Sequence, residues 1–224
     1  MLSDLRQFAE AVVLAVAALL PIVNPLGGAP LYLAKTVDLT SAQHVELARR
    51  VARNCALLLL ASLLLGTYVL AFFGLSLPVV QVAGGLVVCS IAWSLLQQPD
   101  APPALQDESR RMVTSEDLRS RAFYPLTMPL TVGPGSISVA ITLGTQRPKF
   151  GGLSTLAQFG FGAIAGIVAI VATVYLCYRF AESTVAALGK EGTNVVVRLS
   201  AFIMLCIGIQ IMWSGWKDLG PAFH

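Results

Sequence analysis

The chain has 224 residues, of which 56% are hydrophobic and only 12% are charged. Because a soluble domain carries roughly 25% charged residues, this composition excludes an ordinary soluble protein. The net charge of +3 is small. Its basic residues lie in the connections between apolar runs, so the charge does not indicate nucleic-acid binding.

Uncharged apolar runs recur along the whole chain. They occupy residues 11–34, 54–99, 122–146, 150–178 and 199–216. A hydrocarbon core of about 30 Å is crossed by about 20 helical residues, so each run can supply a membrane span. The run 54–99 is long enough for two spans, with a turn at Gly74–Pro78. The sequence therefore predicts an all-α integral membrane protein with six transmembrane helices, whose surroundings are a lipid bilayer.

In chain order, the spans are expected at about 5–38, 42–73, 78–97, 118–146, 150–180 and 193–216. The fifth span carries Gly162 and Gly166 on one face, a spacing that lets helices approach closely. Residues 98–119 form the only extended polar connection and are typical of a solvated linker. We therefore divide the chain into a first three-helix repeat (1–97), a cytoplasmic polar linker (98–119) and a second three-helix repeat (120–224).

Two proline-rich motifs occupy matching places in the first and fourth spans. Their prolines keep a constant offset of 104 residues: Pro21, Pro25 and Pro30, then Pro125, Pro129 and Pro134. Proline removes a backbone N–H and clashes with the carbonyl one turn back, so we expect each span to be two half-helices. Lipid tolerates broken backbone only where protein or a cavity surrounds it, and matching breaks in two halves are typical of a transporter binding site.

The number of spans in each half sets the symmetry. Since three is odd, the second half must enter the membrane from the opposite side. The sequence therefore predicts an inverted 3+3 repeat in which helices 1 and 4 are broken into half-helices. We expect non-helical backbone between Pro129 and Pro134, facing the break at 24–30.

The membrane interior lacks the groups on which most enzymes and metal sites depend. No Asp, Glu, Lys, Arg or His is expected there, because His44 is placed in the loop after the first span and His224 ends the chain. The four cysteines form no Cys-x-x-Cys pair and are interpreted as small buried hydrophobes. We therefore expect no enzymatic activity, no cofactor and no metal site.

Broken helices offer backbone groups in place of charged side chains. A half-helix carries about +0.5 charge at its N-terminus and about −0.5 at its C-terminus, so two inverted breaks present both signs to a zwitterion. Glycine lets a ligand approach the backbone, and neutral Asn, Thr and Ser add hydrogen bonds. The absence of fixed charge favours small neutral amino acids as substrates. The candidate substrate-binding residues are Asn24, Pro25, Gly27, Gly28, Thr127, Thr131, Gly133, Gly135 and Ser136.

The two motifs resemble the signature breaks of the MarC family. They read Pro-Ile-Val-Asn-Pro-Leu-Gly-Gly-Ala-Pro from Pro21 and Tyr-Pro-Leu-Thr-Met-Pro-Leu-Thr-Val-Gly-Pro-Gly-Ser-Ile-Ser from Tyr124. The resemblance covers the whole chain. It implies an inverted three-plus-three repeat in a bacterial or archaeal inner membrane and, for some members, transport of glycine, alanine and similar substrates. The motif positions that it carries over are Asn24, Pro25, Gly27, Gly133, Pro134 and Gly135.

Three functions are compared at this point. The leading interpretation is a secondary transporter or exporter of small neutral amino acids such as glycine and alanine. A membrane redox conduit requires paired reactive cysteines, which the sequence does not offer. A non-transporting scaffold or channel does not require two matched breaks. The sequence leaves open the direction of transport, the coupling ion (proton or sodium) and whether the chain forms a homo-oligomer.

Loop charges predict the orientation of the chain. The connections after spans 1, 3 and 5 hold 11 Lys and Arg residues, whereas the opposite side holds four. The positive-inside rule places the first group in the cytoplasm, and both termini then lie on the outer, periplasmic side. A reporter active only in the cytoplasm should give no signal when fused to His224 and a strong signal when inserted after Asp107. A strong signal at His224 would reverse the orientation.

Overall fold

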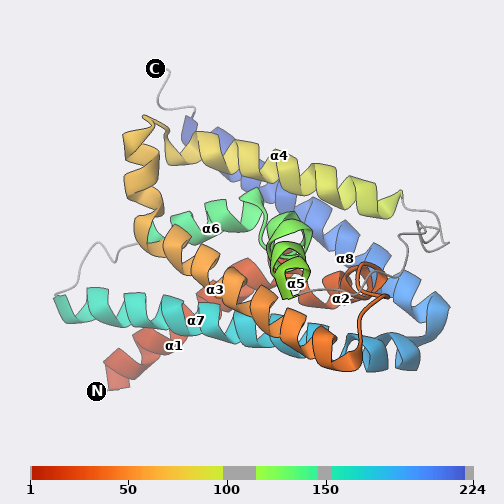
Figure 1. Cartoon of the computed structure of the whole chain (residues 1–224). Helices are drawn as coiled ribbons and strands as arrows, with labels where there is room; N and C mark the ends of the chain where they lie inside the picture. The colour runs from red at the N-terminus through yellow and green to blue at the C-terminus, as the bar shows by residue number, and fades with distance from the viewer. Residues whose placement is uncertain (1, 98–114, 146–152, 220–224) are drawn as a thin grey trace.

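The computed structural model describes residues 2–97, 115–145 and 153–219, and every regular element in them is a helix (Figure 1). The all-α prediction is therefore confirmed for these residues. One element, η1, is wound more widely than an α-helix and has π-helical hydrogen bonding. The elements are α1 (Leu2–Val23), α2 (Pro25–Ala34), α3 (Ser41–Phe72), α4 (Leu77–Leu96), α5 (Ser115–Arg121), η1 (Ala122–Thr131), α6 (Pro134–Thr145), α7 (Leu153–Arg179) and α8 (Ala181–Leu219).

Among the described residues, five helical segments are long and apolar enough to cross a membrane, and a bent pair supplies a sixth candidate. Their outer faces carry exposed large apolar side chains, among them Phe72 and Phe161, as expected of a surface in contact with lipid. In the bent pair, Glu116–Thr131 and Pro134–Thr145 meet at 71°. The five continuous candidates are Arg6–Ala34, Ser41–Phe72, Leu77–Leu96, Phe159–Arg179 and Glu191–Leu219.

Two segments expected as connections are helical where the structure describes them. Residues 115–119 belong to α5, whereas 98–114 of the expected linker lie outside the described residues. Residues 181–192, expected between the last two spans, belong to α8, which departs from helical dihedral angles at Gly189 with φ 68°. This segment contains three Ala and two Glu residues, which are strong helix formers, and glycine accepts the positive φ at little cost.

Glycines permit the closest helix contacts. α4 packs along α8, where a Cβ at Gly85 would lie 2.6 Å from the Gly208 carbonyl oxygen. α1 packs along α7, where a Cβ at Gly162 would lie 2.6 Å from Ala11 Cβ. The close approach predicted from the spacing of Gly162 and Gly166 is therefore confirmed, because small residues on both sides let the two helix backbones meet.

Helix α1 begins and helix α8 ends at the same end of the bundle. Figure 1 shows the start of α1 and the end of α8 there, and the end of α4 and the α7–α8 junction at the opposite end. We call this opposite end, which also carries the turn 35–40, the basic end. Arg121 pairs there with Asp38 at 2.7 Å, which ties α5 and η1 to the turn between α2 and α3.

We expect Gly85→Ala to destabilise the bundle. The new Cβ would stand 2.6 Å from the Gly208 carbonyl oxygen and 2.8 Å from the Met212 amide nitrogen, and overpacking of this kind costs about 1–3 kcal/mol. Gly160→Ala is the matched control, because no atom lies within 4 Å of its Cβ position. Thermal unfolding in detergent should give a lower midpoint for Gly85→Ala alone. Equal midpoints would contradict the close packing of α4 on α8.

Candidate functional site

The first helix break is a single residue. Asn24 lies between α1 and α2 with φ 45° and ψ 59°, a left-handed conformation that asparagine adopts more readily than most residues. Its side-chain Oδ1 accepts a hydrogen bond from the Gly27 amide at 3.1 Å and so caps α2. The interruption is narrower than the expected break at 24–30, because Pro30 lies within α2, and Pro21 lies within α1. A proline removes one hydrogen bond without ending a membrane helix where neighbours support it.

Helix α8 covers this first break. Asn24 Nδ2 lies 3.3 Å from Met204 Sδ, and a Cβ at Gly27 would lie 2.8 Å from Ser200 Cβ. A thioether is a weak hydrogen-bond acceptor, so the Asn24 amide group can donate instead to a stronger acceptor. Sequence reasoning missed Met204 and Ser200, because an apolar run does not reveal which of its faces meets a distant helix.

The second break is longer than the first. Within η1, Tyr124 and Met128 have extended dihedral angles, and the peptide bonds before Pro125 and Pro129 are cis. η1 and α6 then meet at 71° across residues 132–133. The irregular backbone therefore begins before Pro129, earlier than the proline spacing indicated.

Threonine hydroxyls satisfy carbonyl groups inside the second break. Thr127 Oγ1 donates to the Ala122 carbonyl at 2.6 Å, and Thr131 Oγ1 donates to the Leu126 carbonyl at 2.7 Å. The Val132 amide bonds the Thr127 carbonyl at 2.8 Å. Both candidate threonines are buried. Their hydroxyls give hydrogen-bond partners to backbone carbonyls, because the prolines interrupt the regular helical bonds there.

The four motif glycines have different surroundings. A Cβ at Gly28 would lie 2.8 Å from a tyrosine hydroxyl, and one at Gly135 would clash with the Val88 side chain. A Cβ at Gly27 would meet the Asn24 side chain. At Gly133, by contrast, the nearest atom is a carbonyl oxygen at 3.4 Å, which is ordinary contact. In this conformation Gly133 alone among the four leaves space beside the backbone.

Tyr178 connects the two breaks. It is buried at the end of α7, and its hydroxyl lies 2.7 Å from Thr131 Oγ1. Because the Thr131 hydroxyl hydrogen goes to the Leu126 carbonyl, Tyr178 is the donor of this bond. The same hydroxyl stands over Gly28, and the ring stacks on Tyr32 with centroids 4.6 Å apart. Sequence reasoning missed both tyrosines. The sequence signal that could have found them is that each tyrosine places a hydroxyl within an apolar span.

The remaining candidates lie beside the same breaks. Pro25 is the buried first residue of α2, a position that suits proline because its amide would have no helical partner. Ser136 is buried in the first turn of α6, and its hydroxyl donates to the Gly133 carbonyl at 2.9 Å. The nine candidates therefore lie at two places. The four from Asn24 to Gly28 are covered by α8 and α7, and the five from Thr127 to Ser136 lie at the second break, where α4 packs against Gly135.

These features define a multi-pass helical membrane protein with two interrupted helical segments. The chain belongs to the MarC family: the model for MarC family integral membrane proteins matches residues 9–219. It is 26% identical to the UPF0056 membrane protein YvbG of Bacillus subtilis, over 92% of this chain and 93% of that protein. It is also 26% identical to the UPF0056 inner membrane protein MarC of Salmonella typhimurium, over 96% and 98%.

A third relative is the UPF0056 membrane protein YhcE of Escherichia coli, which is 29% identical over 91% of each chain. No solved structure is a significant match to this chain. The family and the apolar helices together identify an integral membrane protein.

We expect Gly28→Ala to destabilise the protein by about 1–3 kcal/mol through overpacking, because its Cβ would lie 2.8 Å from the Tyr178 hydroxyl. Tyr178→Phe removes that hydroxyl, so the double variant should recover part of the loss in a thermal-unfolding cycle. Tyr175→Phe is the matched control, since that hydroxyl bonds Arg179 instead, and it should rescue nothing. Strict additivity of Gly28→Ala and Tyr178→Phe would contradict the contact.

Proposed function

We propose that this chain is a secondary transporter of small neutral amino acids, such as glycine and alanine, and that the substrate binds between the two helix breaks near the middle of the membrane. The observation that carries the proposal is the pair of interruptions at Asn24 and at residues 132–133, with Tyr178 in contact with both motifs. Interrupted spans bring free backbone groups into the membrane, where a transporter uses them to bind its substrate.

The packing of the helices supports an inverted repeat. Exchanging the first three spans for the last three converts the α1–α7 contact into the η1–α3 contact, the α2–α7 contact into the α6–α3 contact, and the α2–α8 contact into the α6–α4 contact. The same exchange converts the α4–α8 and α3–α7 contacts into themselves. A pseudo-twofold axis in the membrane plane produces this pattern. We therefore propose repeats at 1–97 and 120–224, with α1–α2 and η1–α6 as the broken spans.

We assign the substrate carboxylate to Asn24 and the start of α2. The side-chain amide faces the Met204 thioether at 3.3 Å. A carboxylate would be a far stronger acceptor, because hydrogen bonds to charged groups are roughly twice as strong as neutral ones. The positive end of the α2 dipole adds to the attraction. Met204 is flexible enough to move aside.

We assign the substrate ammonium to the second break. Carbonyl groups at the end of η1 carry the negative end of its dipole, and Gly133 leaves space beside the backbone. The hydrogen bonds at both breaks, in the described residues, join neutral groups only. A charged substrate side chain would therefore be buried without a partner, at a cost of several kcal/mol. This arrangement favours glycine, alanine, serine and threonine over lysine and glutamate.

The names of relatives support a location in the inner membrane. Relatives in Salmonella are named inner membrane proteins, and we propose the same membrane here, with both termini outside.

The arrangement of the cysteines does not favour the alternative function of a membrane redox conduit. The four cysteines are free thiols on four different helices, so no disulfide is formed that could carry electrons. A cysteine-free variant should therefore transport normally.

Flux in proteoliposomes tests the function. Vesicles with purified protein should take up or release labelled glycine and alanine faster than empty vesicles, under an imposed proton or sodium gradient. Unlabelled serine should compete, and lysine or glutamate should not. Absence of flux in both directions under both gradients would overturn the transporter. Equal competition by glutamate would overturn the neutral site.

Two variants test the residues of the site. Gly133→Val should abolish alanine binding with little loss of stability, because its side chain enters space that is open in this conformation. Asn24→Ala should lower affinity by up to about tenfold, the effect of losing one hydrogen bond of about 0.5–1.5 kcal/mol. Gly160→Val, whose Cβ meets nothing within 4 Å, is the control for an uncrowded glycine and should bind normally. Normal binding by Gly133→Val would remove the second break from the site.

Gly135→Val is a poor test of binding. A Cβ there would clash with the Val88 side chain, so loss of stability would accompany any loss of binding.

A further inference from the structure

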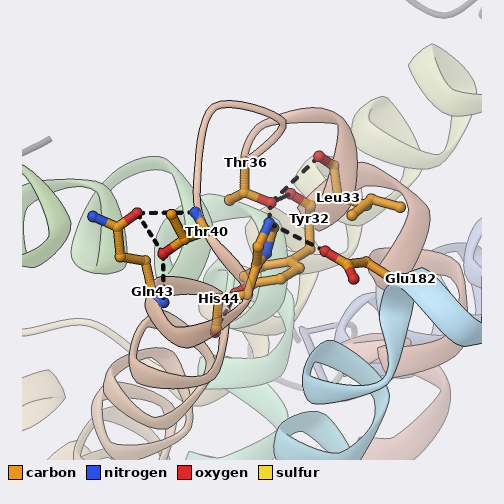
Figure 2. A network of polar contacts seen from close by, with 7 residues as sticks. All are labelled: Tyr32, Leu33, Thr36, Thr40, Gln43, His44 and Glu182. Atoms are coloured by element: carbon orange, nitrogen blue, oxygen red, sulfur yellow. Dashed lines mark hydrogen bonds and ion pairs between the residues drawn. The ribbon is translucent and has the colours of Figure 1, made fainter. Parts of the chain in front are cut away.

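His44 is a buried titratable side chain that the proposed substrate site does not use. The sequence placed it in a polar loop, but it occupies the first turn of α3 and is only 6% exposed. Figure 2 shows its ring between Thr36, which follows α2, and Glu182, which begins α8. The turn is fixed by a capping box, in which Gln43 Oε1 accepts from the Thr40 amide at 2.9 Å.

Both ring nitrogens of His44 face hydrogen-bond acceptors. Nδ1 lies 3.3 Å from Thr36 Oγ1, whose own hydrogen is donated to the Tyr32 carbonyl at 2.8 Å. Nε2 lies 3.6 Å from Glu182 Oε1, within ion-pair range. A neutral imidazole has one N–H, whereas the imidazolium has two. In this arrangement an imidazolium could donate at both nitrogens, whereas a neutral ring could donate at only one of them.

Other groups near this turn have partners elsewhere or face outward. Asp38 pairs with Arg121 at 2.7 Å, and Arg179 bonds the Tyr175 hydroxyl at 3.0 Å. Tyr32 is the titratable group that meets the imidazole directly, edge-on, with centroids 5.9 Å apart. The other charged residues on the surrounding elements are exposed: Lys35, Arg49, Glu116, Asp117 and Arg119.

A line of buried contacts leads from His44 to the second break. Tyr32 Oη donates to the His44 carbonyl at 2.8 Å, and the Tyr32 ring stacks on Tyr178. Tyr178 in turn bonds Thr131 at 2.7 Å. These four side chains are buried, whereas the Glu182 side chain is 57% exposed. The line therefore joins the candidate substrate site to the surface at the basic end.

We propose that His44 is a proton-binding site that holds the basic end of the bundle closed. The bound proton supplies the second N–H, so the ring joins Thr36 to Glu182 and keeps Tyr32 against Tyr178. Loss of the proton leaves the ring with a single N–H, so it can no longer donate to Thr36 and Glu182 together, and α8 loosens from α2 and α3. This inference rests on the proposed transport function and deepens it, because it names a proton as the ion that controls access to the site.

The sign of the pH dependence follows from linkage. The closed arrangement binds the proton, so acid favours it. The stabilisation is lost as the pH rises and the proton dissociates. Opening at the basic end should therefore increase between about pH 5.5 and about pH 8.

Hydrogen exchange of the protein in lipid nanodiscs tests this without any transport measurement. The reporters are the amides of Thr36, Leu39 and Thr184, which bond the carbonyls of Leu33, Thr36 and Phe180 around the His44 network. Their protection, relative to the intrinsic exchange rate at each pH, should fall by about fivefold or more from pH 5.5 to pH 8. In His44→Gln, which cannot titrate, protection should be the same at both pH values.

Two further variants make the test specific. Glu182→Gln changes a half-exposed side chain, and it should reduce protection at pH 5.5 and abolish most of the pH dependence. Glu46→Gln removes the same charge from α3, where the partner is Arg50 on the same helix, and it should leave the pH dependence intact. Unchanged protection in the wild type, or full pH dependence in His44→Gln, would overturn the proton site.

The same preparations separate this proposal from the transport function. Proteoliposomes that move neither glycine nor alanine, but show pH-dependent protection, would overturn the transporter and leave the proton site standing. Proteoliposomes that move alanine, but show no pH-dependent protection, would overturn the proton site alone.

Discussion

Backbone groups inside a membrane must find partners within the protein, and both helix breaks are built around that requirement. At the first break, the Asn24 side chain caps α2 through the Gly27 amide. At the second, Thr127 and Thr131 donate to carbonyls one wide turn back, and Tyr178 donates to Thr131. Neutral side chains thus support the interrupted backbone, so the irregular segments can persist in apolar surroundings.

The two breaks are also the places where the spans can bend most easily. A span that is already interrupted can change direction without losing further helical hydrogen bonds, as hinges do in domain closure. In the present conformation the surroundings are tightly closed, with Gly28 under the Tyr178 hydroxyl and Gly135 against Val88. If the proposed function holds, substrate binding requires that helices around these glycines separate. The packing contacts of the glycines hold the present conformation together.

Polar contacts across the bundle join the two proposed repeats to each other. Asp38 pairs with Arg121 and His44 meets Glu182 at the basic end, while Asn24 meets α8 at the first break. Gln81 on α4 adds a hydrogen bond to α6 through Thr142 at 3.1 Å. Each contact pairs an element before the linker with one after it. The helices of the two proposed repeats also pack mainly on each other, as α4 does on α8 and α1 on α7, so relative movement of the repeats would disturb apolar packing together with these polar contacts.

The sequence by itself predicted the apolar membrane helices and the neighbourhood of the two interruptions, because apolar length and proline chemistry are local properties. It did not fix their extent, since the first is confined to Asn24 and the second begins before Pro129. Only the tertiary structure decided which side chains meet there. It brought His44 from an expected loop into a buried network, and it placed Tyr178 between segments about 100 residues apart in the chain. It also distinguished Gly133 from Gly135, since the space beside a glycine depends on a distant helix that local pattern cannot reveal.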